Sequence, residues 1–151
     1  MIFTYDNLIN SIAGVLATIK DVPVYDSPSY NTDFPCFYVF LVNPKIDEQI
    51  SDVHYRETMI DIVYVQERNS TAQNVELHEI HEGLDENFGM IPYKDFSDEN
   101  SEPVLLHTYE RNASIEDQEL HYKFTIKQRV MVDKKHIYMN DLEENNVEVK
   151  G

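Results

Sequence analysis

Two stretches of the chain repeat apolar residues at the spacing of an α-helix. The first covers about residues 4–20, and Thr4 is a suitable N-cap because its hydroxyl can accept a hydrogen bond from a free backbone N–H. The second covers about residues 71–88, and Gly89 stands at the position where a glycine often ends a helix. Each segment has a single apolar stripe, so the pattern predicts two amphipathic helices packed on one core.

The other apolar segments have the composition and spacing of β-strands. Residues 36–42 form an unbroken aromatic and β-branched run, which predicts a buried strand. In residues 120–132 apolar and polar residues alternate, so one face of this strand should meet the core and the other water. The expected strands cover residues 22–25, 36–42, 53–65, 104–110 and 120–132, with a polar connection at 45–51 and a long polar loop at 90–102.

This succession of elements favours an α+β fold. Strands joined by short polar connections predict a mainly antiparallel sheet of four to five strands, with the two helices packed on one face. We expect a single domain over residues 1–133 and a polar, acidic C-terminal arm over residues 134–151. The predicted core comprises Phe37, Val39, Leu41, Ile60, Ile62, Leu77, Ile80, Leu84, Tyr122, Phe124 and Ile126.

The charge narrows the range of functions. The chain has 151 residues, with 28 Asp and Glu against 12 Lys and Arg, a formal net charge of −16. Sequence-independent binding to duplex DNA or to anionic lipid needs surplus Lys and Arg, so the composition argues against both. The N-terminus lacks the basic residues of a signal peptide, and no apolar run approaches the roughly 20 residues that span a bilayer, so a cytoplasmic protein is expected.

Residues that could support catalysis or bind a metal are few. His78 and His81 are three positions apart, whereas a zinc-protease helix places two histidines four apart, and no third ligand follows. Cys36, the single cysteine, begins the most apolar strand, where a neutral and inert thiol is expected. The four glycines are scattered, which excludes a glycine-rich phosphate loop. We therefore predict no enzyme activity, no catalytic residue, no cofactor and no metal.

The charges are unevenly placed along the chain. Residues 66–102 contain ten acidic residues against two basic ones, which a solvated helix and loop would also explain. A subunit with an acidic and a basic side can also associate head-to-tail and close into a ring. The candidate subunit interface comprises Lys123, Lys127 and Arg129 of the last strand and Glu79, Glu82, Asp85 and Glu86 of the second helix. A candidate partner-contact loop comprises Lys45, Asp47 and Glu48.

Several short patterns follow one another over nearly the whole domain. They are Leu8-Ile9 with Ile12 and Leu16, Pro23-Val24-Tyr25, Phe34-Pro35-Cys36-Phe37-Tyr38-Val39, Tyr55-Arg56, Ile60-Asp61-Ile62-Val63-Tyr64, the helix before Gly89, and Leu120-His121-Tyr122-Lys123-Phe124-Thr125-Ile126. This succession resembles the small tail terminator, or tail completion, proteins of phages and prophage elements of Gram-positive bacteria. None of the patterns is a catalytic signature, and the resemblance carries no active-site residues.

The resemblance implies a structural protein of the virion. It implies an α+β subunit that forms a hexameric ring on the tail tube, ends tube polymerisation and joins the tail to the head. The implied partners are other copies of the chain, the tail tube protein, a neck or connector protein and, in contractile tails, the sheath protein. Assembly in the bacterial host cytoplasm is expected, with DNA passing through the ring without sequence-specific binding and with no membrane contact.

Three alternatives stay open on the sequence. One is an acidic protein that mimics DNA and inhibits a basic partner, for which inhibition of a nuclease would be diagnostic. Another is a different neck or connector adaptor protein. The third is a metal-dependent enzyme built on His78, His81 and a carboxylate, for which stoichiometric bound metal would be diagnostic.

Overall fold

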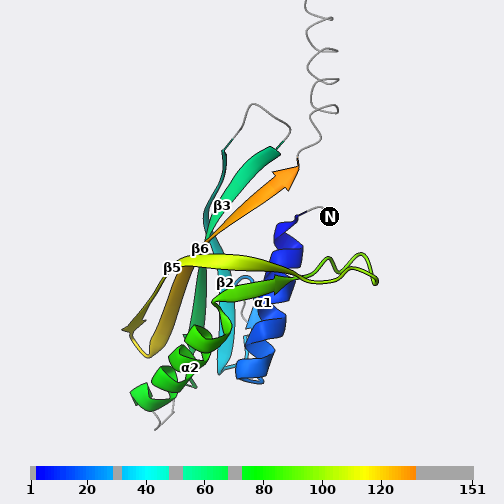
Figure 1. Ribbon diagram of the computed structural model, residues 1–151. Coiled ribbons are helices and arrows are strands. Elements are labelled where there is room, and N and C mark those ends of the chain that lie inside the picture. The colour runs from blue at the N-terminus through cyan, green and yellow to red at the C-terminus, as the bar shows by residue number, and fades with distance from the viewer. Residues whose placement is uncertain (1–2, 29–31, 48–52, 68–72, 132–151) are drawn as a thin grey trace, which may run out of the picture.

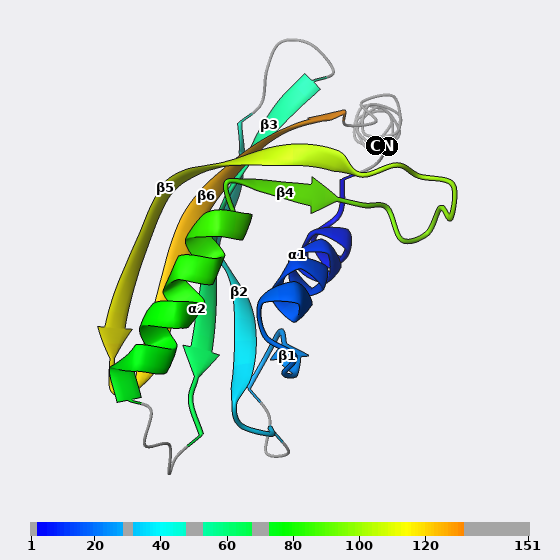
Figure 2. The same ribbon diagram turned by 60° about the horizontal axis from the view of Figure 1, so that its bottom comes forward.

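A curled sheet wraps around two helices that lie on one of its sides (Figure 1; Figure 2). The computed structural model describes residues 3–28, 32–47, 53–67 and 73–131. The elements in chain order are α1 (Tyr5–Ile19), β1 (Val24–Tyr25), β2 (Cys36–Asp47), β3 (Val53–Val65), α2 (Gln73–Asn87), β4 (Met90–Tyr93), β5 (Val104–Glu116) and β6 (Glu119–Met131). The expected arm, residues 134–151, lies outside the described residues.

The sheet has six strands in the order β1-β2-β3-β6-β5-β4. Four of its strand pairs are antiparallel, and β1 runs parallel to β2 with Val24 opposite Phe37. The sheet is thus mainly antiparallel, as expected, but the expected number of four to five strands was wrong, and β1 adds one parallel pair. The physical reason is that a ten-residue connection, rather than a tight turn, joins β1 to β2 and lets the chain return in the same direction.

Both helices form where the apolar stripes predicted them. Thr4 caps α1, because its Oγ1 accepts a hydrogen bond from the Asn7 backbone N–H at 3.2 Å. The second helix, α2, packs close to α1 at Gly83, where an added Cβ would lie 3.0 Å from Cγ2 of Ile19. Gly89 follows the end of α2, as the sequence predicted, although it does not adopt the positive φ of a left-handed helix cap.

The predicted core residues pack together between the sheet and the helices. All of them are buried except Leu41, which is half-buried against the others. The structure adds further buried residues to this core from α1, β3, β4, β5 and β6 and from the residue that follows α2. These are Leu8, Ile12, Leu16, Tyr64, Phe88, Ile91, Tyr93, Leu106 and Leu120.

Strand β4 lies within the segment that was expected to be a polar loop. Ile91 and Tyr93 are buried, and the Tyr93 hydroxyl accepts a hydrogen bond from the Thr4 backbone N–H at 2.9 Å. The backbone N–H of Lys94 then donates to Oγ of Ser11 at 3.0 Å, which ties the end of β4 to α1. Four residues that include Pro92 are too few to show the alternating pattern of a strand, and the sequence therefore gave no sign of it. Residues 90–93 form a strand because β5 and α1 supply their hydrogen-bond partners.

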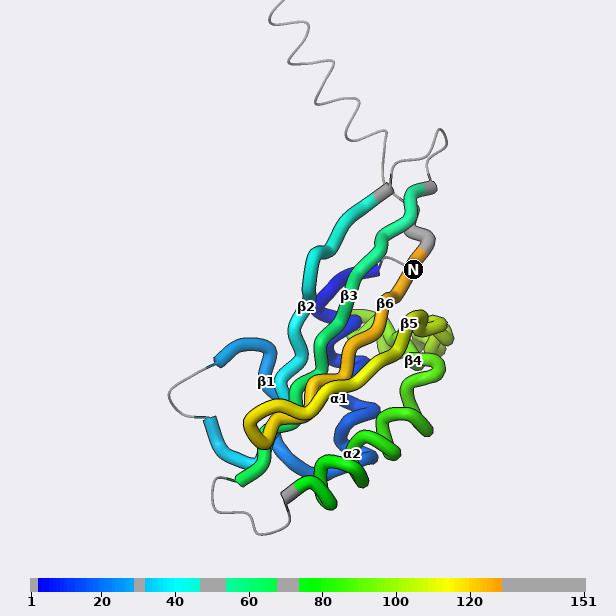
Figure 3. Tube along the Cα trace, turned by 90° about the vertical axis from the view of Figure 1, so that its left-hand side faces the viewer, coloured from blue at the N-terminus to red at the C-terminus, as the bar shows by residue number. Residues whose placement is uncertain are grey.

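Two strands are longer than predicted, and each continues past a bulge. β2 continues through the polar residues to Asp47, with a register shift after Val42 and a positive φ of 47° at Asn43. β5 continues to Glu116, with a shift after Tyr109 and a φ of 56° at Glu110. Residues 45–47, which were expected to begin the polar connection, therefore belong to β2. Bulges bend strands and increase their twist, which accounts for the curl of the sheet (Figure 3).

Candidate subunit interface

The face of the sheet opposite the helices carries Lys123 and Lys127. Their neighbours on β6, Phe124 and Ile126, point into the core, and Phe124 packs on Phe88 with ring centroids 5.7 Å apart. Because successive residues of a strand point to opposite faces, both lysines lie on the side without helices. We call this side the helix-free face. The alternation of residues 120–132 thus predicted the position of these two side chains correctly; the Arg129 side chain lies outside the described part of the chain.

Carboxylates of β3 lie beside these lysines. Lys127 is directly opposite Glu57, and Lys123 is directly opposite Asp61. Glu57 also pairs with Lys45 of β2, with 3.8 Å between Nζ and Oε2. The Nζ of Lys127 lies 5.4 Å from the ring centroid of Tyr109, a cation–π distance. The helix-free face is therefore a mixed surface of alternating charges and not a uniformly basic one.

Apolar side chains run across the same face. Met59 lies opposite Val42 of β2 and Thr125 of β6, and Thr125 lies opposite Tyr109 of β5. Met59 is 38% exposed and Tyr109 is 44% exposed, and Phe40 lies half-buried one row further along. The sequence predicted that the whole run 36–42 would be buried, but the helices cover only one of its two faces. Phe40, Met59 and Tyr109 remain uncovered by the helices, and we call them the apolar strip.

A carboxylate on this face has an unpaired oxygen. Oδ2 of Asp61 lies 3.3 Å from Nδ1 of His121, whose Nε2 is 3.3 Å from Oε2 of Glu119. The other oxygen, Oδ1 of Asp61, is buried and has no hydrogen-bond partner among the described residues. A buried acceptor without a donor destabilises the isolated subunit, and a donor from a covering partner would relieve this.

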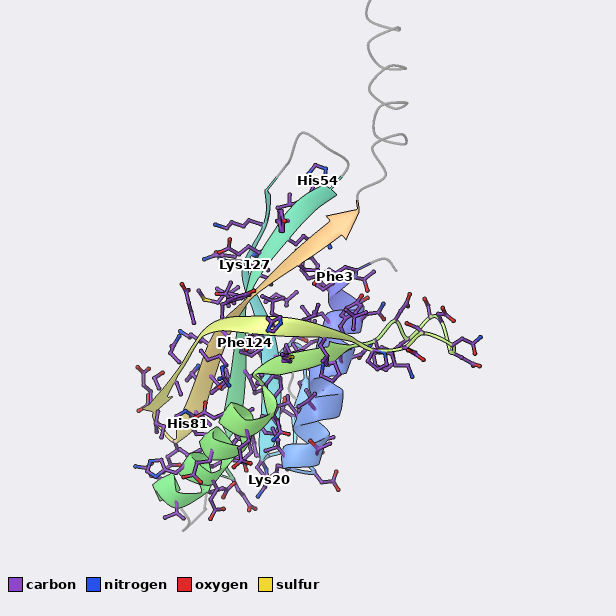
Figure 4. All side chains as sticks on the ribbon, in the orientation of Figure 1. Phe3, Lys20, His54, His81, Phe124 and Lys127 are labelled. Atoms are coloured by element: carbon purple, nitrogen blue, oxygen red, sulfur yellow. The ribbon has the colours of Figure 1, made fainter. Side chains whose placement is uncertain are left out.

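Helix α2 presents an acidic surface on the other side of the molecule. It carries five acidic residues and no Lys or Arg. Glu79, Glu82 and Glu86 are exposed, at helical spacings that bring like charges together. Asp85 differs from them, because its Oδ1 accepts a hydrogen bond from the buried Tyr122 hydroxyl and its Oδ2 lies 3.4 Å from Nε2 of His81. Figure 4 places His81 on α2, well separated from Lys127 on the sheet.

Part of the predicted contact loop lies at the end of β2, which pairs with the start of β3. The start of β3 extends beyond both helices (Figure 1). Lys45 and Asp47 belong to β2, with Lys45 exposed, whereas Glu48 and the Asp47 side chain lie outside the described residues. On the neighbouring strand Arg56 stacks on Tyr5 at 5.1 Å from the ring centroid, which fixes the base of the hairpin to the start of α1.

Cys36 and the two helix histidines were the residues weighed for catalysis or metal binding. Cys36 is fully buried, and burial raises the pKa of its thiol, so it stays neutral near pH 7 as the sequence indicated. His78 is exposed, and the imidazole of His81 packs edge-on against Tyr122. In the described ranges no three His, Cys, Asp or Glu side chains are grouped so that they could hold a metal ion. No helix among these residues is long and apolar enough to cross a membrane.

Sequence reasoning missed the carboxylates and the apolar strip that accompany the lysines. Glu57 and Asp61 lie on β3, about 65 residues before their partners on β6, and nothing local indicates which residues become opposite one another. One signal was available, since β3 alternates Glu57, Met59 and Asp61 with the residues Thr58, Ile60 and Ile62. That alternation predicts a solvent-facing side of β3, but the pairing register is needed to place it beside β6.

Comparison with known families gives a match over most of the chain. Residues 7–138 match the model of a phage tail terminator protein family, which covers all the described elements except the first residues of α1. No curated protein matches the sequence. The chain belongs to the phage tail terminator family, a family of structural phage tail proteins, and its place is in the tail of the virion.

Proposed function

We propose that the protein forms a closed ring of six copies that caps the tail tube. The ring ends tube polymerisation and offers its outer surface to the neck or connector protein of the head, and in a contractile tail to the last sheath ring. The family membership supports a role in the tail, and the resemblance described above is the source of the number six and of the capping role.

The observation that carries the proposal is that the two candidate interface surfaces lie on opposite sides of one subunit. Lys123 and Lys127 are on the helix-free face, and Glu79, Glu82 and Glu86 are on α2. Surfaces on opposite sides favour head-to-tail association, which closes into a ring when the rotation between neighbours permits. In this arrangement α2 of one copy covers the helix-free face of the next.

Apolar contact and charge pairing contribute differently to such an interface. Because Glu57 and Asp61 already neutralise the lysines in part, the net attraction for α2 is modest and is further screened by salt. Burial of Met59, Phe40 and Tyr109 therefore supplies most of the affinity, at roughly 25 cal/mol per Å² of apolar surface. A donor from the neighbouring copy would also satisfy the free oxygen of Asp61.

The net charge fits the passage of DNA through the ring. Each copy carries a formal charge of −16, and acidic walls repel phosphates so that the genome slides without binding. The predicted contact loop, with Lys45, Asp47 and Glu48, is proposed as a contact with a tube, neck or sheath protein. The start of β3, which pairs with the end of β2, projects beyond the helices and supports this part of the proposal (Figure 1).

Charge reversal at the interface tests the ring. The variant Lys127→Glu with Arg129→Glu should fold normally while tails grow to uncontrolled length, because copies no longer close around the tube. Lys127→Arg keeps the charge and serves as the matched control. Adding Glu82→Lys and Glu86→Lys to the charge-reversed variant should restore tails of normal length, since the attraction is then re-formed with opposite signs.

Deletion of the protein tests the function itself. Without it, tails should be abnormal in length and should fail to join heads. Normal-length tails that join heads and deliver DNA would contradict the terminator role of this chain. Inhibition of a nuclease by the purified protein would then favour the DNA-mimic alternative.

A further inference from the structure

A groove of about 410 Å³ lies between α1 and the segment that follows β4. Val15 of α1, Pro92 of β4, and Phe96 and Pro103 of the β4–β5 loop provide its apolar lining. Phe96 is 51% exposed, so an apolar side chain stands at the rim without cover. The loop is held against α1, because Nδ2 of Asn7 donates to Oδ1 of Asp95 and the Phe96 N–H donates to Oδ1 of Asn7, both at 3.2 Å.

Gly14 forms part of the lining in the middle of α1. Glycine is the least favourable residue in a helix interior apart from proline, so its presence calls for a reason. No close approach within the fold supplies one, because a Cβ added at Gly14 would meet no atom within 4 Å among the described residues. A glycine at an open position of a helix allows another backbone to approach closely.

The charges around the groove suit a basic and apolar peptide. The loop above it carries Asp98, Glu99 and Glu102, all exposed, whereas Lys94 is held near the Phe96 ring at 5.7 Å. The sequence that follows β6 has this complementary chemistry, since Lys134-Lys135-His136 immediately precede the apolar cluster Ile137-Tyr138-Met139. The family match also continues beyond β6 into this segment, to residue 138.

The segment is long enough to reach the groove of its own subunit. Val130 of β6 pairs with His54, and Arg56, two residues further along β3, stacks on Tyr5. The end of β6 therefore lies beside the start of α1. Gly14 is nine residues along α1 from Tyr5, about 14 Å at 1.5 Å per residue. Ile137 follows Met131 by six residues, which extend to about 20 Å.

We propose that residues 134–139 dock into this groove in cis, with Ile137-Tyr138-Met139 against Gly14 and Phe96. Lys134 and Lys135 then face the acidic loop. The short tether gives the segment a high effective concentration at the groove, so modest contacts suffice to hold it there. This inference concerns the single subunit and does not depend on ring formation or on the tail tube.

Disulfide trapping in the full-length chain tests the proposal. The variant Gly14→Cys with Tyr138→Cys is oxidised with diamide at low protein concentration, and the linked peptides are identified by mass spectrometry. The matched control is Ala17→Cys with Tyr138→Cys, because Ala17 is exposed on the same helix but does not line the groove. The native Cys36 is buried. The single variants Gly14→Cys, Ala17→Cys and Tyr138→Cys show whether Cys36 forms a disulfide with any of the introduced cysteines.

The expected result is an intramolecular link that forms at least tenfold faster at position 14 than at position 17, at a rate independent of protein concentration. Equal rates at the two positions would overturn the proposal. Links that form between chains, at a rate that rises with concentration, would overturn docking in cis and assign the groove to a second copy. If the groove binds only another protein, the two cysteine pairs should form links equally slowly, which would also overturn the proposal.

Hydrogen exchange provides a measurement without cysteines. Gly14→Leu fills the groove from a position with open space, whereas Ala17→Leu adds the same side chain outside it. Amide exchange in residues 134–139 should become at least fivefold faster in Gly14→Leu and should stay unchanged in Ala17→Leu. Identical exchange in both variants, at the wild-type rate, would overturn the proposal.

Discussion

The Tyr122 hydroxyl donates a hydrogen bond to Oδ1 of Asp85 at 2.7 Å, which joins the central strand β6 to helix α2. Tyr122 is fully buried, whereas the Asp85 side chain is 55% exposed at the surface of α2. A parallel link joins Tyr64 of β3 to Glu76 at the start of the same helix. Two core tyrosines therefore position the acidic helix, and Asp85 serves the fold as well as the candidate interface.

Removing the Tyr122 hydroxyl should destabilise the protein. Tyr122→Phe keeps the ring in the core but deletes the donor to Asp85, so the free energy of unfolding should fall by about 1–2 kcal/mol. Urea denaturation followed by circular dichroism measures the change. Tyr109→Phe is the control, because Tyr109 is exposed and its ring remains available to Lys127. Equal stability of the two variants would contradict the structural role of the Tyr122–Asp85 bond.

Stability should decline at high pH because of the same tyrosine. Burial, followed by the hydrogen bond and charge of Asp85, raises the pKa of Tyr122 from 10 to about 12. Between these values the unfolded chain has lost the proton and the folded chain retains it, so unfolding is favoured as pH rises. The loss is up to about 1.4 kcal/mol per pH unit from this group. Urea titrations from pH 9 to 12 should show a shallower decline for Tyr122→Phe than for the wild type.

The turn between β5 and β6 should be improved by glycine. Asp117 and Gln118 form a two-residue connection with φ of 51° and 65°, the left-handed region that most side chains disfavour. Gln118→Gly removes this strain and should raise the free energy of unfolding by about 0.5–1 kcal/mol. Gln118→Ala loses the same polar side chain but retains a Cβ, so it should show no such gain. A thermal melt compares the two variants.

The two helical glycines should respond differently to alanine. Gly14→Ala improves helix propensity, and its methyl group meets no described atom within 4 Å, so it should stabilise the fold by about 0.5–1 kcal/mol less any contact that docked residues 137–139 lose. Gly83→Ala brings the same gain in propensity but places Cβ 3.0 Å from Cγ2 of Ile19, which must move. Denaturant titration should therefore show a smaller gain, or a loss, for Gly83→Ala. An equal gain for both would mean that α1 and α2 are not in close contact.

The amino-acid sequence by itself determined the elements with a strong local pattern. The stripes Leu8, Ile12, Leu16 and Leu77, Ile80, Leu84 can be buried only if each segment is helical. The alternation in residues 120–132 likewise decided that Phe124 faces the core while Lys123 and Lys127 face away from it. Such information is local, because hydrophobic burial favours one side of a helix or strand whatever its partner is.

The tertiary structure alone decided which surfaces became neighbours. Residues 90–93 form a strand because β5 and α1 supply hydrogen-bond partners, and β1 pairs parallel because its connection to β2 is long. Glu57 and Asp61 lie beside the lysines of β6 only because of the register between β3 and β6. The groove beside Gly14 likewise exists only because the β4–β5 loop lies against α1. These features depend on contacts between residues far apart in the chain, for which spacing along the sequence carries no information.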